Sequence, residues 1–117
     1  MKALSDYIVT SSNAEKIVTA MSKAHPDAPI LFAPDKNLGR WLMEKTGRPM
    51  RLWQGSCVVH ETFSLRKIIA LREKHPDAKI IAHPECPPDV LAEADYVGST
   101  AGMIGFVKKV TPGHKVV

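Results

Sequence analysis

The sequence predicts an α/β domain with a largely parallel sheet, formed by a chain of 117 residues. Short runs rich in β-branched and aromatic residues end in turn or polar residues, and longer segments of helical period separate them. A chain of this length removes roughly two thirds of its unfolded surface from water when it folds, which suffices for one core. Its hydrophobic share of 44% and charged share of 24% are those of an ordinary globular protein.

Six short runs are candidate strands, and five longer segments are candidate helices. The strands are expected at residues 8–10, 30–33, 51–53, 79–82, 96–97 and 114–117. The helices are expected at residues 13–23, 37–46, 64–74, 88–94 and 101–110. The helix expected at 64–74 has the clearest signals, because Ser64 can cap its first turn and Pro76 stops the run.

Two short patterns occur twice in the chain. Residues 23–35 match residues 74–85, and each copy runs from a helix end through a His-Pro-Asp turn and a buried strand to a proline and an acid. Residues 5–12 match residues 94–100, and each copy places two hydroxyl residues between a strand and a helix. Similar βα units that reuse the same turn chemistry explain both matches. We expect His25 and His75, which stand in the turns, to have no chemical role.

Composition and charge argue against several classes of protein. The formal charge of +4 is spread along the chain, which does not favour a nucleic-acid partner. No apolar run approaches the roughly 20 residues of a membrane span, and the first residues lack the apolar stretch of a signal peptide. We therefore expect a cytoplasmic protein without a membrane partner. In such a compartment the two cysteines, Cys57 and Cys86, argue for metal binding or catalysis rather than a disulfide framework.

The loops that follow the predicted strands contain most of the residues able to carry chemistry. Parallel strands bring their carboxyl ends to one edge of a sheet, where ligands bind in open α/β folds. Two of these loops contain hydroxyl pairs, Ser11-Ser12 and Ser99-Thr100, each at the start of a predicted helix. Their side chains and the free backbone N–H groups can bind a carboxylate or phosphate, or can simply cap the helix. Spacing alone leaves both readings open.

Two further loops contain a Cys-x-x-His string and a His-x-x-Cys string. Cys57, His60, His83 and Cys86 could satisfy a zinc ion, since their spacing is ordinary for zinc ligands, although an α/β core does not need a structural zinc ion. Two cysteines cannot hold an iron–sulfur cluster alone, and either thiol could be a small buried apolar group. Glu85, next to this set, is a candidate acid or base if its surroundings perturb its pKa, or else a solvated loop residue. Asp35 is ambiguous in the same way.

Five strings, in this order and spacing, resemble the quinolinate synthases. They are Thr10-Ser11-Ser12-Asn13-Ala14, Pro34-Asp35-Lys36-Asn37-Leu38-Gly39, Trp53-Gln54-Gly55-Ser56-Cys57-Val58-Val59-His60, His83-Pro84-Glu85 and Val97-Gly98-Ser99-Thr100. The resemblance implies an αβα sandwich, one of three similar domains around a pseudo-threefold axis, with a [4Fe–4S] cluster where the domains meet. It implies that each domain gives one cysteine, here Cys57, that Cys86 is not required, and that one iron is left open as a Lewis acid.

The resemblance also implies a reaction and a set of roles. Quinolinate synthases condense iminoaspartate with dihydroxyacetone phosphate, losing phosphate and two waters, to form quinolinate for NAD biosynthesis. By position, Ser11, Ser99 and Thr100 would hold carboxylate or phosphate oxygens, and His60 and His83 would bind or polarise the substrate. Glu85 would transfer protons, so that Glu85, His60 and His83 are the expected catalytic residues.

The same resemblance predicts that residues 1–117 are a single domain, the central one, excised from its two flanking domains. We expect the isolated chain to lack quinolinate synthase activity and to bind no stable cluster as a monomer. Self-association around a threefold axis could bring three Cys57 thiolates together. Two other classes remain open: a non-catalytic anion-binding α/β module using the hydroxyl loops, and a zinc-stabilised structural domain.

Overall fold

Among the described residues the strands pair in parallel, and helices lie between them, which confirms the predicted α/β class. In the computed structural model, which describes residues 2–110, 113 and 115–117, the ladders form two two-stranded sheets. Strand β1 (Leu31–Phe32) pairs with β2 (Arg51–Leu52), with Leu31 opposite Arg51. Strand β3 (Ile81–Ala82) pairs with β4 (Tyr96–Val97), with Ile81 opposite Tyr96. The parallel pairing is thus divided between two small sheets.

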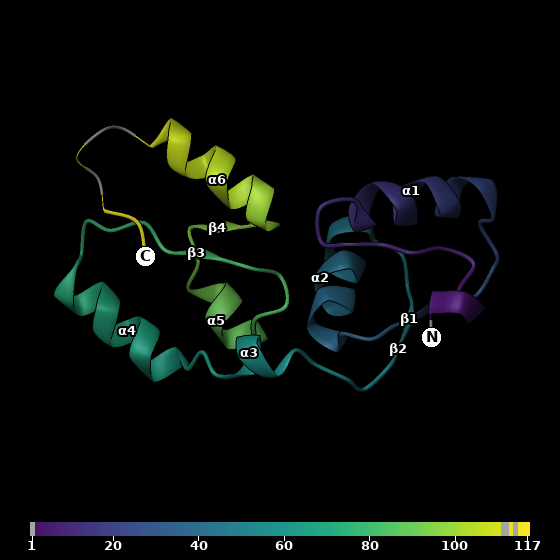
Figure 1. Cartoon of the computed structure of the whole chain (residues 1–117), viewed down its shortest axis with the longest axis horizontal. Helices are drawn as coiled ribbons and strands as arrows, with labels where there is room; N and C mark the ends of the chain where they lie inside the picture. Colours follow the sequence, from purple (N-terminus) through teal and green to yellow (C-terminus); the bar gives the residue numbers. More distant parts are fainter. Residues whose placement is uncertain (1, 111–112, 114) are drawn as a thin grey trace.

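Each sheet and its helices occupy one end of an elongated molecule of 47 × 27 × 24 Å (Figure 1). The helices are η1 (Lys2–Leu4), α1 (Ala14–Ala24), α2 (Lys36–Thr46), α3 (Val58–Glu61), α4 (Leu65–Lys74), α5 (Pro88–Ala92) and α6 (Thr100–Lys109). All five predicted helices are present with ends shifted by no more than two residues, whereas the short η1 and α3 are not predicted. No helix in the described part of the chain combines the length and apolarity needed to cross a membrane.

Two of the predicted strands turn out differently. The strand predicted at residues 8–10 is wrong, because these residues form no ladder and Ile8 is 56% exposed. The Thr10 N–H donates instead to Asn13 Oδ1 (2.7 Å), in the turn that leads into α1. Of the strand predicted at 114–117, His114 lies outside the described residues, and Val116 forms a parallel bridge to Lys79 beside β3.

The first sequence repeat is also a repeat in structure. The N–H of His25 closes α1 on the Met21 carbonyl (2.8 Å), and the N–H of His75 closes α4 on the Leu71 carbonyl (2.9 Å). The two histidines have nearly the same backbone angles, φ −136° and ψ 72° against φ −135° and ψ 70°. Each turn then leads into the first strand of its sheet, so similar turn chemistry builds both halves.

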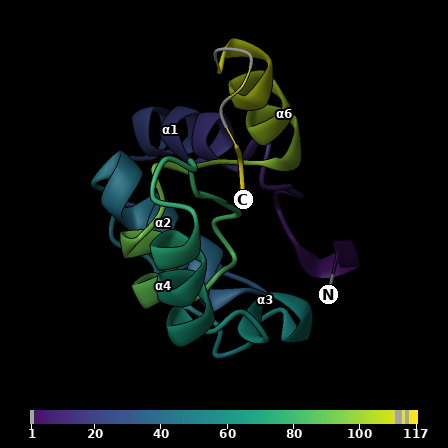
Figure 2. The ribbon, with the colours of Figure 1, turned by 90° about the vertical axis from the view of Figure 1, so that its left-hand side faces the viewer.

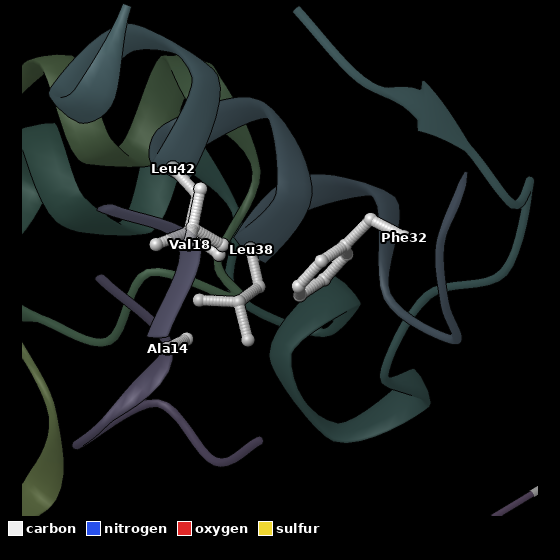
Figure 3. Packing of buried hydrophobic residues seen from close by; sticks show 5 residues of the cluster. All are labelled: Ala14, Val18, Phe32, Leu38 and Leu42. Atoms are coloured by element: carbon white, nitrogen blue, oxygen red, sulfur yellow. The ribbon is translucent and has the colours of Figure 1, made fainter. Parts of the chain in front are cut away.

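Each half of the molecule has its own small core. Ala14, Val18, Phe32, Leu38 and Leu42 pack α1 and α2 against β1 (Figure 3). In the other half Ala82, Cys86 and Val90 pack β3 against α5. Burial of these side chains fixes the start of α2, which supports the site described below, and the loop after β3, which carries His83 and Glu85.

The contact between α2 and the first sheet depends on a glycine. An added Cβ at Gly39 would lie 2.6 Å from Leu52 Cδ2 and 2.9 Å from Phe32 Cδ1, whereas Gly105 in α6 faces open space. We expect Gly39→Ala to lower the free energy of unfolding by about 1–2 kcal/mol, because overpacking costs about 1–3 kcal/mol and alanine regains about 0.5–1 kcal/mol in the helix. Gly105→Ala should raise it by about 0.5–1 kcal/mol, because alanine loses less backbone entropy in a helix. Urea unfolding of both variants tests this pair, and a shift in the same direction would contradict it.

Candidate functional site

Asp35 ties the end of the first sheet to Cys57. Its side chain is buried, and the residue is only 5% exposed. One carboxylate oxygen caps α2 by accepting the Leu38 N–H (2.7 Å), and the other accepts the Cys57 N–H (2.8 Å). A parallel bridge between Asp35 and Gly55 holds the two loops together as they leave β1 and β2. Cys57 therefore sits at a fixed place immediately before α3.

Asn37 joins this edge to the other half of the molecule. It lies in the first turn of α2, is 2% exposed, and its amide donates to Glu61 Oε1 (3.0 Å) and to the Glu85 carbonyl (3.1 Å). The loop after β3 is thus held against α2 and α3. The loop after β4 leaves from the same edge as the loop after β3, because the Gly98 N–H donates to the Ala82 carbonyl (3.1 Å).

Cys57, His60 and Glu85 come together where these loops meet. One potential ligand atom from each of the three residues lies within 4.8 Å of the other two. His60 Nδ1 is 3.2 Å from Glu85 Oε2, and the ring of His60 stacks on that of His83 with centroids 4.8 Å apart. All three residues are partly exposed, and the Cys57 thiol is free. The arrangement brings a thiol, an imidazole and a carboxyl group to one point.

The Nδ1 atom of His60 is itself buried. Although Glu85 Oε2 is within ion-pair distance, the two groups are not aligned as a hydrogen bond, and no other group in the described part of the chain pairs with this nitrogen. Within the described residues, the polar contact of this nitrogen is therefore limited to the Glu85 carboxylate, 3.2 Å away.

His83 is held in its neutral form. Burial lowers the pKa of His83 most strongly; Glu85 raises it, His60 lowers it, and Asp35 raises it. Its Nδ1 accepts the Glu85 N–H (3.4 Å), so the ring proton is assigned to Nε2. His83 can thus donate a hydrogen bond from Nε2 at neutral pH.

The lowered pKa of His83 makes stability depend on pH. The unfolded histidine, with a pKa of about 6.5, takes up its proton at a higher pH than the folded one. The free energy of unfolding should therefore fall as the pH drops below about 6.5 and level off below the folded pKa. In His83→Gln this loss should be smaller, as urea unfolding at about pH 7.5 and 5.5 can measure. An equal loss in parent and variant would contradict the assignment.

Cys86 has a different environment from Cys57. It is 4% exposed and packs in the core beside Ala82 and Val90. Burial raises the pKa of the Cys86 thiol, which favours the neutral form over the thiolate that binds metal. Of the two thiols, that of Cys57 is the more exposed, and so the more accessible to a metal ion or a substrate.

The hydroxyl residues lie at the starts of two helices. Ser99 caps α6 by accepting the Gly102 N–H (3.2 Å), and Thr100 is exposed in the first turn. Ser11 precedes α1 in a turn where Thr10 and Ser12 share a hydrogen bond (2.9 Å). Both helices begin near the middle of the long axis and run toward opposite ends (Figure 1). Among the described residues, no hydrogen bond joins Ser11 or Ser99 to the histidines.

These helix starts and α3 lie on different sides of the molecule. Helices α1 and α6 are in the upper part of both views, and α3 is at the bottom (Figures 1 and 2). The structure thus gathers four predicted residues, Cys57, His60, His83 and Glu85, and does not join Ser11 to them. Ser99 is linked to His83 and Glu85 because the loops that carry these residues leave the neighbouring ends of β4 and β3.

A cavity of about 550 Å³ opens beside the histidines, between α4 and the second sheet. His60, His83 and Cys86 line one part of it, and mainly apolar side chains such as Ile68 and Met103 line the rest. Its volume is in the range of small-molecule sites. A substrate bound there would lie beside His60 and His83.

Comparison with known proteins identifies the family. The sequence profile of the quinolinate synthetase A protein matches residues 1–117. Quinolinate synthase from Microcystis aeruginosa is 60% identical over 109 residues, which are 93% of this chain and 33% of the relative. Those from a Cyanothece species and from Trichodesmium erythraeum are 57% and 55% identical over the same shares. The chain thus spans about a third of the length of these relatives, and it belongs to the quinolinate synthetase A family.

Proposed function

We propose that this chain provides one cysteine ligand and part of the substrate site of a quinolinate synthase. The observation that carries the proposal is the grouping of Cys57, His60 and Glu85 within 4.8 Å beside a cavity that reaches His83. A thiolate next to an imidazole and a carboxylate combines a metal ligand with groups that bind substrate and transfer protons. The reaction is the condensation of iminoaspartate with dihydroxyacetone phosphate to quinolinate.

The donor set fits one corner of a [4Fe–4S] cluster. Such a cluster needs several thiolates, and here Cys57 is accessible while Cys86 is buried with a raised pKa. Cys57 would therefore hold one iron, and the other thiolates would come from the rest of the protein, in line with the share of the relatives that this chain spans. When bound, a cluster with one iron free of protein ligands supplies a Lewis acid for a substrate oxygen or nitrogen.

The surrounding residues have separate tasks in this proposal. Glu85 transfers protons, His60 orients the substrate beside it, and neutral His83 donates from Nε2 to a substrate oxygen. The family resemblance assigns Ser11, Ser99 and Thr100, at the starts of α1 and α6, to carboxylate or phosphate binding through hydroxyl and backbone N–H groups. In this proposal that role rests on the resemblance, since these helix starts lie on a different side of the molecule from α3. The 117-residue chain alone should form no quinolinate, because it lacks the remaining thiolates.

A chimera tests this function. This chain would replace the matching third of the Microcystis aeruginosa enzyme, which is 60% identical in that segment. Purified without oxygen, the chimera should hold about four irons and four sulfides per chain and form quinolinate. Cys57→Ser should lose the iron and the activity, and Cys86→Ala should keep the iron. Full iron content in Cys57→Ser would contradict the proposal.

A further inference from the structure

We propose that Cys57, His60 and Glu85 also form a site for a single divalent cation, best suited to Zn²⁺, in the chain without a cluster. The three residues provide one thiolate, one imidazole and one carboxylate, each an ordinary zinc ligand. Three protein ligands and a water complete the tetrahedral set typical of open zinc sites. Two anionic ligands would neutralise the charge of the ion.

The spacing of the ligand atoms suits one ion. In a tetrahedral zinc site, bonds of about 2.0–2.3 Å place ligand atoms about 3.3–3.8 Å apart. His60 Nδ1 and Glu85 Oε2 are already 3.2 Å apart, and all three ligand atoms lie within 4.8 Å of one another. Small side-chain rotations therefore suffice to close the site around an ion.

The buried nitrogen of His60 also supports a cation site. Its Nδ1 makes no hydrogen bond within the described ranges, 2–110, 113 and 115–117, and the Glu85 carboxylate lies 3.2 Å from it, so a cation bound between the two would be a ligand partner for both. An imidazole nitrogen and a carboxylate oxygen 3.2 Å apart, without a hydrogen bond between them, can both bind one cation.

The backbone around the site is fixed by residues that are not ligands. Asp35 holds the Cys57 N–H, and Asn37 holds the Glu85 carbonyl, while His83 stacks on His60. Such outer contacts orient ligands and raise metal affinity. This ligand set differs from Cys57, His60, His83 and Cys86, suggested by spacing, since Cys86 is buried and Nδ1 of His83 accepts the Glu85 N–H.

Cobalt is a visible probe for this site. The reduced 117-residue chain, titrated with Co²⁺ under anaerobic conditions, should bind one ion, with thiolate-to-cobalt charge transfer and tetrahedral ligand-field bands that Zn²⁺ abolishes. Cys57→Ser should remove the charge-transfer band, and His60→Gln and Glu85→Gln should each weaken binding at least about 10-fold. Asp35→Asn should weaken it about 10–100-fold through the outer contact.

Two control variants and one comparison make the outcome decisive. His25→Gln and Cys86→Ala should bind Co²⁺ like the parent, and circular dichroism should show that each variant is folded. Absence of the charge-transfer band in the parent, or unchanged binding by folded His60→Gln and Glu85→Gln, would overturn the inference. In the chimera, His60→Gln should keep its iron, because His60 is no cluster ligand. Failure of the zinc site and failure of the proposed function are therefore separate results.

Discussion

Glu85→Gln in the chimera should lower kcat for quinolinate formation by about 10²–10⁴-fold, the usual contribution of a positioned general acid or base. Glutamine keeps the shape of the side chain but cannot carry the proton. The fold should persist, because Asn37 bonds to the backbone carbonyl of Glu85 and not to its carboxylate. The effect should therefore lie in the chemical step.

Iron content and kinetics together test this prediction. Glu85→Gln should retain the iron and sulfide of the parent while kcat falls, and Glu73→Gln, an exposed change on α4, should leave both unchanged. A kcat within about twofold of the parent would show that Glu85 does not transfer the proton. Loss of iron together with activity would instead place Glu85 in the support of the cluster.

Asp35→Ala should lower the free energy of unfolding of the chain by about 2–5 kcal/mol. The change leaves two backbone N–H groups without acceptors, those of Leu38 and Cys57. Loss of a helix cap costs about 0.5–2 kcal/mol, and loss of a hydrogen bond to a charged group costs about 1.5–3 kcal/mol. This is a large share of a typical stability of about 5–15 kcal/mol.

Ser64→Ala is the matched control for Asp35→Ala. Ser64 caps α4 through a longer hydrogen bond to the Lys67 N–H (3.3 Å) and is exposed, so its loss should cost only about 0.5–1 kcal/mol. Asp35→Asn keeps an acceptor oxygen and should fall between the two. Urea unfolding of the three variants measures the order, and equal losses for Asp35→Ala and Ser64→Ala would refute the double role of Asp35.

The helices could be predicted from sequence because their signals are local. Ser64 caps α4 as predicted, and the helix ends immediately before His75 and Pro76. Helix α3 has no such signal, since it is four residues long and begins with two exposed valines, Val58 and Val59. The strand predicted at residues 8–10 failed for another reason: a strand needs a neighbour to bond with, and its apolar residues alone do not supply one.

The site could be predicted only in part. Placement after parallel strands was enough to suggest that Cys57, His60, His83 and Glu85 meet. The contacts that hold them there were not visible in the sequence, because they join residues 22 apart between Asp35 and Cys57 and 48 apart between Asn37 and Glu85. The cap signal of Asp35 was present before α2, but nothing local indicated its second hydrogen bond.

An anaerobic crystal structure of the chimera, with anomalous scattering recorded at the iron edge, tests the assignment of Cys57 most directly. We expect an iron peak at bonding distance from Cys57 Sγ, with His60 and Glu85 beside the same cluster and Cys86 still enclosed in its core. Iron bound at Cys86, or a cluster with the Cys57 thiol free and remote from it, would contradict this assignment.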